Sequence, residues 1–200
     1  MRRAAATLAA GLSHAMAGRG EESREWLLRA AARYRESYAE APPGSWGRPI
    51  AVLKALLLAG EDAEDAARWT LAEGADAAES PIGRYAAALA HAVLGEWEAV
   101  RILADGLRTG DGFPTDVADA LAFLAAEDVV GYTAAVQEVL ASFVGREGYL
   151  EDVAVVDTVL VLQAVAAGRD MAVELDSPLL PSESLGASSS PRRRGGARRP

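Results

Sequence analysis

The stretch VAVVDTVLVLQAVAA, residues 153–167, decides the fold because it is long enough to form a helix and is apolar on every side. A helix of this kind must be surrounded by other helices. Its only polar side chains are Asp157, Thr158 and Gln163, and a buried carboxylate needs a partner or a raised pKa. We therefore expect residues 153–167 to form the central helix, with Asp157 neutralised by Arg84 or Arg146.

Outward from this stretch, apolar residues recur at helical spacing along most of the chain. Ser80 followed by Pro81 is typical of a helix start. No segment alternates for long with the period of a strand, and residues 171–181 are expected to pack as an apolar extended strap. The sequence predicts an all-α fold of about nine helices in one domain, residues 1–181, followed by a disordered Ser- and Arg-rich tail, residues 182–200.

The helices recur in pairs around a short hinge. In each pair an apolar helix ends, a glycine or an acidic residue follows, and an Ala-rich segment begins. The hinges lie about 32 to 42 residues apart, which is typical of two-helix solenoid repeats; they are Gly18, Gly60, Gly95, Glu127 and Gly168. This spacing favours a right-handed array of antiparallel helix pairs. The alternative is a compact helical bundle whose helices simply end at glycines.

The paired segments resemble the tetratricopeptide class of helical repeats over residues 4–170. A tryptophan, an interhelical glycine and small alanine positions carry the resemblance, as in LLLAGEDAEDAARWTLAEG, residues 56–74, and HAVLGEWEAVRILADGL, residues 91–107. The resemblance implies a solenoid in which the first helix of each pair lines a concave, protein-binding surface. As a compact helical domain without catalytic motifs, the chain also resembles the immunity 49 family of polymorphic-toxin immunity proteins.

Charge is distributed unevenly along the chain. The formal net charge is −9, from 20 basic and 29 acidic residues, but five of the arginines lie within residues 184–200, where there is no acid. The rest of the chain has 15 basic and 29 acidic residues, a charge of −14. A body this acidic repels nucleic acid and anionic membranes and favours a basic protein partner. The arginine tail would allow at most weak, non-specific contact with nucleic acid.

The absence of cysteines and of long apolar runs indicates where in the cell the protein is expected. The chain contains no cysteine, which excludes disulfides and thiolate metal sites and is typical of a reducing interior. No run reaches the roughly 18 to 20 apolar residues that a membrane-spanning helix needs. We therefore expect a cytoplasmic protein that does not enter a membrane.

Polar residues on the first helices mark the predicted concave surface. Arg84, Asp116 and Asp157 each lie eleven positions before a hinge, which places them at the same depth in successive pairs. The same helices also carry Lys54, His91, Asp119 and Gln163. Together these side chains predict a small charged groove that grips a peptide terminus or a polar loop. The other interpretation, which we favour, is that Asp157 belongs to an internal ion pair with Arg84 or Arg146 that only specifies packing.

Trp46 lies in a loop, residues 42–47, where no helical period requires an aromatic side chain. It is either an anchor for a partner or a staple that closes the entry to the next helix. Trp26, Trp69 and Trp97 follow helical spacing, and we expect them to pack in second helices.

Signatures of catalysis and cofactor binding are missing. The sequence has two histidines, no cysteine, and none of the spaced motifs of a serine hydrolase, a zinc peptidase or a phosphate-binding loop. We therefore expect a non-enzymatic protein-binding module that needs no cofactor and no metal. Two alternatives remain open. One is an immunity protein that neutralises a basic toxin, and the other is a hydrolase-type enzyme that uses Asp157, Asp116, Arg84 and His91.

Overall fold

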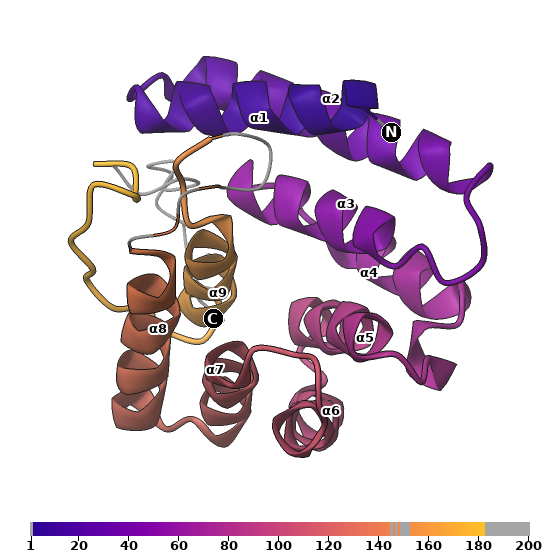
Figure 1. Ribbon diagram of the computed structural model, residues 1–200, viewed down its shortest axis with the longest axis vertical. Coiled ribbons are helices and arrows are strands. Elements are labelled where there is room, and N and C mark those ends of the chain that lie inside the picture. The colour runs from indigo at the N-terminus through magenta and orange to yellow at the C-terminus, as the bar shows by residue number, and fades with distance from the viewer. Residues whose placement is uncertain (1, 145, 147, 149–152, 183–200) are drawn as a thin grey trace, which may run out of the picture.

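The computed structural model describes residues 2–144, 146, 148 and 153–182, and this part of the chain is helical with no strand (Figure 1). The predicted all-α fold is confirmed. The tail beyond residue 182 lies outside the described residues, and so does the prediction that it is disordered. In chain order the elements are α1 (Arg2–Met16), α2 (Gly20–Tyr38), α3 (Gly47–Leu58), α4 (Glu64–Ala72), the short 3-10 helix η1 (Ala75–Ala77), α5 (Pro81–Leu94), α6 (Trp97–Thr109), α7 (Thr115–Ala126), α8 (Val129–Phe143) and α9 (Asp157–Ala167).

The first four predicted hinges each separate two helices that pack on one another. All four have a left-handed backbone, a common way to end a helix; they are Gly18 (φ 69°), Gly60 (φ 69°), Gly95 (φ 74°) and Glu127 (φ 57°). Glu127 adopts this conformation although its Cβ makes it less favourable by about 1–2 kcal/mol than it is for glycine. The position of the turn is therefore held by the packing of α7 and α8 rather than by a glycine.

The fifth hinge differs from the other four. Gly168 has φ −64°, and the left-handed residue is Asp170, with φ 57°. No second helix follows within residues 169–182, so the helix-pair pattern is wrong at this hinge. The predicted strap, residues 171–181, follows instead, and in its first part the side chains of Met171, Val173 and Leu175 turn inward while those between them are exposed.

The helix pairs follow one another along an arc, and α9 lies inside it (Figure 1). The chain runs from α1 and α2 through α3 and α4 to α5 and α6, and then returns through α7 and α8. Helix α9 packs against α3, α7 and α8. The inner side of these helices, which the repeat pattern predicts to be an open groove, is therefore covered by α9.

Helix α9 is shorter than the sequence predicts. The apolar stretch begins at residue 153, but the helix begins at Asp157. The preceding residues are largely β-branched, which favours extended backbone, and Val156 donates its backbone N–H to the carbonyl of Leu179 in the strap at 3.1 Å. Asp157 therefore lies in the first turn of α9, where the helix dipole favours a negative charge.

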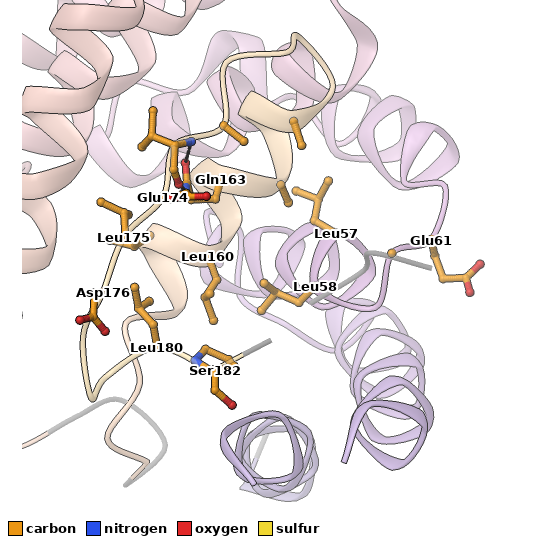
Figure 2. A pocket seen from close by; sticks show the side chains of 17 residues that line it. Leu57, Leu58, Glu61, Leu160, Gln163, Glu174, Leu175, Asp176, Leu180 and Ser182 are labelled. Atoms are coloured by element: carbon orange, nitrogen blue, oxygen red, sulfur yellow. Dashed lines mark hydrogen bonds between the residues drawn. The ribbon is translucent and has the colours of Figure 1, made fainter. Parts of the chain in front are cut away.

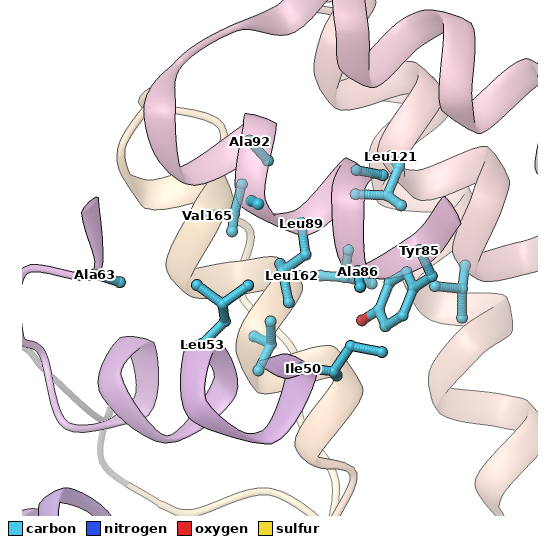
Figure 3. Packing of buried hydrophobic residues seen from close by; sticks show 14 of the residues in the cluster. Ile50, Leu53, Ala63, Tyr85, Ala86, Leu89, Ala92, Leu121, Leu162 and Val165 are labelled. Carbon is cyan, nitrogen blue, oxygen red and sulfur yellow. The ribbon is translucent and has the colours of Figure 1, made fainter. Parts of the chain in front are cut away.

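Side chains from four helices meet in the core (Figure 3). Leu53 of α3, Leu89 of α5, Leu121 of α7 and Leu162 of α9 are all buried, with at most 1% of their surface exposed. Burying side chains of this size is the main favourable contribution to the fold, at about 1.5–3 kcal/mol for each. Among the described residues, no helix has both the length and the apolar character needed to cross a membrane.

Arg169, just after α9, contacts residues at two of the other hinges. Its guanidinium lies 4.0 Å from the ring centroid of Trp97, which follows the third hinge. It also donates a hydrogen bond to the carboxylate of Glu127, the fourth hinge. Only 10% of the Arg169 side chain is exposed, so its stacking on Trp97 is shielded from water, whereas its partner Glu127 is 77% exposed. Together the two contacts join the end of α9 to α6 and α7.

The backbone of Gly83 in α5 lies very close to neighbouring side chains. A Cβ placed there would lie 2.4 Å from the Cβ of Ala78 and 2.8 Å from Nε1 of Trp46, whose indole is buried. We expect Gly83→Ala to lower the free energy of unfolding by about 1–3 kcal/mol through overpacking. Urea unfolding followed by circular dichroism measures this change.

Gly106, inside α6, provides the matched control. A Cβ at this position meets nothing closer than Nη1 of Arg84, at 3.9 Å. Gly106→Ala should therefore stabilise the protein by about 0.5–1 kcal/mol, because alanine favours a helix. If both substitutions changed stability with the same sign, the close packing of Trp46 on α5 would be contradicted.

Candidate functional site

Lys54 and Asp157 form a buried ion pair between α3 and α9. Nζ of Lys54 lies 3.0 Å from Oδ2 of Asp157, with 11% and 13% of the two side chains exposed. Lys54 also donates to Oγ1 of Thr158 at 3.4 Å. The prediction that an arginine neutralises Asp157 is wrong: Arg146 stacks on Phe143 instead. Asp157 is 103 residues from its true partner, a separation that no local pattern reveals.

Tyr85 of α5 is buried beside this ion pair. Its hydroxyl has no hydrogen-bond partner among the described residues, and burial raises its pKa. Burial by itself lowers the pKa of Lys54, but the nearby Asp157 carboxylate outweighs this effect, so that the pKa of Lys54 lies above its ordinary value. The lysine is therefore held as a cation, which suits an ion pair and not a nucleophile.

His91 lies in the last turn of α5 between two carboxylates. Its Nε2 is 2.7 Å from Oδ1 of Asp76 in η1, and its Nδ1 is 2.5 Å from Oε2 of Glu96, just before α6. Burial by itself lowers the pKa of the imidazole, but the hydrogen bonds to Asp76 and Glu96 raise it by more. The net effect is a pKa above the ordinary value. The charged ring donates from both nitrogens, and it also lies at the helix end where a cation is favoured.

Two of the predicted acidic residues lie on α7, away from Asp157. Asp119 pairs with Arg108 of α6, whose Nε is 2.6 Å from its Oδ1. Asp116 is half-buried in the first turn of α7 and makes no ion pair with any residue that the structure describes. Arg84 likewise has no ion pair within the described part, and its guanidinium lies near Gly106 of α6.

Gln163 and Trp46 have structural neighbours that the sequence does not show. The side-chain amide of Gln163 donates to the carbonyl of Val173, and its Oε1 accepts from the backbone N–H of Val173 at 3.3 Å and from the hydroxyl of Tyr132 at 2.8 Å. Gln163 thus fastens the strap to α9. Trp46, with 8% of its surface exposed, packs at the N-terminal end of α5, so its indole is not displayed to a partner.

The predicted site residues therefore do not gather in one place. Of the eight, the structure brings only Lys54 and Asp157 into direct contact. His91 and Asp157 have separate partners, so the cluster that a carboxylate and histidine hydrolase would need is not assembled by these side chains. The described residues also hold no group of three His, Asp or Glu side chains placed to bind a metal ion.

A groove opens instead at the edge of the arc, between the end of α3, one face of α9 and the strap (Figure 2). Its volume is about 1020 Å³. Leucine side chains from all three elements face this space, and carboxylates lie at its margin. The leucines are Leu57, Leu58, Leu160, Leu175 and Leu180, and the carboxylates belong to Glu61, Glu174 and Asp176.

Of the predicted site residues, Gln163 alone lines this groove. The sequence did contain a signal for the groove residues of the strap. In the segment MAVELDS, residues 171–177, apolar Met171, Val173 and Leu175 alternate with Ala172, Glu174 and Asp176. The alternation is too short to predict a strand or its register, and the leucines of α3 are indistinguishable in sequence from core residues.

Comparisons of the chain with protein-family models, with curated proteins and with solved structures give no match.

We expect Asp157→Asn to lower the free energy of unfolding by about 3–5 kcal/mol, because it leaves the buried Lys54 cation without its counter-charge. Chemical unfolding in urea measures the loss. Glu64→Gln is the control, since it breaks the 2.8 Å surface pair with Arg68, which contributes about 0–1 kcal/mol. The double substitution Lys54→Met with Asp157→Leu should recover most of the loss. An Asp157→Asn protein as stable as the wild type would contradict a structural role for the pair.

The position of His91 between Asp76 and Glu96, called here the histidine clamp, predicts that the stability of the protein depends on pH. The pKa of folded His91 lies above its ordinary value of 6.5, so its charged form stabilises the fold below that pH, and the contribution is lost as the pH rises through the folded value. Thermal melts across this range should show the wild type losing its advantage over His91→Gln as the pH rises. His14→Gln, which removes the other histidine, should keep the wild-type profile. Parallel profiles for wild type and His91→Gln would show that the clamp does not hold a proton.

Proposed function

We propose that this chain is a non-enzymatic, cytoplasmic helical module that binds another protein through the groove between α3, α9 and the strap. The observation that carries the proposal is the groove itself, where half-buried leucines remain accessible beside carboxylates. An accessible apolar surface bordered by charge is typical of protein-interaction sites.

The disposition of the polar side chains supports a binding role. Lys54 and Asp157 neutralise each other, and His91 is held between two carboxylates that occupy both of its ring nitrogens. Residues used in this way contribute to stability, and the carboxylates that line the groove have no histidine, lysine or arginine beside them in its lining. The groove is therefore better suited to recognition than to chemistry.

The acidity of the chain favours a second candidate, an immunity protein that neutralises a basic toxin. Outside residues 184–200 the formal charge is −14. An acidic surface accelerates association with a basic partner and rejects acidic ones. Under this alternative the groove would receive part of the toxin, and the toxin would be harmful when produced without this protein.

We expect a specific protein to be captured from a lysate of the source organism when the full chain is immobilised, and to elute as the salt concentration rises. Ala172 is exposed at the groove, so Ala172→Trp should block the groove without disturbing the core and should abolish the capture. Mass spectrometry identifies the bound protein, and producing that protein alone in cells tests whether it is toxic.

Ala134→Trp is the control, because Ala134 is exposed on α8 and does not line the groove. It adds the same indole elsewhere on the surface and should leave the capture unchanged. The proposal fails if no protein is captured, or if the captured protein is retained equally by wild type and Ala172→Trp.

A further inference from the structure

We propose that the groove binds an extended, cationic segment of the partner, in which apolar side chains alternate with arginine or lysine. This inference rests on the proposed function and names the chemistry of its partner. Three features of the groove lead to it: the apolar floor, the charge at its margin and the unpaired backbone of the strap.

The floor of the groove is built to receive apolar side chains. Leu57 of α3 and Leu160 of α9 are only half-buried, although neighbouring residues of the same helices are part of the core. Leu175 and Leu180 of the strap lie across from them (Figure 2). The groove volume of about 1020 Å³ is at the upper end of the range for ligand sites, which is room for several side chains of a peptide.

The margin of the groove is negative. Its lining residues include three carboxylates and no lysine or arginine. Glu61 is already paired with Arg24 of α2, whereas Glu174 and Asp176 are exposed and have no ion-pair partner among the described residues. A cation bound beside the strap would neutralise these two charges, while an acidic peptide would be repelled.

The strap offers backbone groups that are free to pair. Gln163 occupies both the N–H and the carbonyl of Val173, but the backbone of Glu174, Leu175 and Asp176 makes no hydrogen bond to another described residue. Side chains along the strap already alternate between buried and exposed. A partner segment that lies extended along the strap can use these donors and acceptors, as in strand addition, whereas a helical segment cannot.

The test measures binding of fluorescein-labelled synthetic peptides to the full chain by fluorescence anisotropy. The first probe alternates Leu with Arg. The second has the same composition with the leucines at helical spacing, and the third replaces every Arg with Glu. We expect the alternating Leu and Arg probe to bind, the helical arrangement to bind more weakly, and the Glu probe not to bind. Tighter binding of the helical arrangement, or binding of the Glu probe, would overturn the inference.

Variants of the protein locate the site. Ala172→Trp should abolish binding of the first probe, and the pair Glu174→Gln with Asp176→Asn should weaken it about tenfold. The pair Asp111→Asn with Glu138→Gln is the matched control, because it removes two exposed carboxylates that lie outside the groove. If the control pair weakened binding equally, attraction by the overall negative charge would explain the result, and the inference would fail.

Two other occupants of the groove would also overturn the inference. If the wild type failed to bind the probe but a chain with all five tail arginines replaced by Gln bound it, the occupant would be the chain's own tail. If the wild type formed dimers that Ala172→Trp abolished, the occupant would be a second copy. Failure of every probe, with groove-dependent capture from the lysate intact, would refute the cationic chemistry alone, whereas loss of that capture as well would refute the proposed function.

Discussion

The burial of α9 is the constraint on which the rest of the structure depends. A helix that is apolar on every side cannot lie at a surface without exposing much of what it should bury. Its leucine and valine side chains are covered by α3 and by the α7–α8 pair, which are far apart from each other in the sequence. The arc of helix pairs therefore closes around α9.

The Lys54–Asp157 pair makes this arrangement specific. Apolar packing alone would tolerate a rotation or a shift of α9 within the arc, because many apolar surfaces fit one another about equally well. A buried carboxylate has few acceptable positions, and here its position is beside Lys54 of α3. Arg169 fixes the opposite end of α9 against the third and fourth hinges, so the helix is held at both of its ends.

Closure of the arc has a consequence for recognition. In an open solenoid the first helices would present their polar residues to a partner, but here α9 covers α3 and α7 from the inside. The accessible apolar surface moves to the edge, where α3 ends and the strap crosses α9. The strap is both a wall of this groove and a segment tied to the core through Gln163, so groove and fold depend on the same contacts.

The sequence by itself determined the helical class, four of the five hinges and the extended strap, because these depend on local properties: the spacing of apolar residues, the glycines at helix ends and the prolines around residues 178–181. It also favoured a cation as the partner of Asp157. Only the tertiary structure decided which cation that is, where the α9 helix begins and that His91 lies between Asp76 and Glu96. These facts depend on contacts between distant parts of the chain. For the same reason the groove was not predictable, since a leucine that lines a groove and a leucine that fills a core look the same until the neighbouring helices are placed.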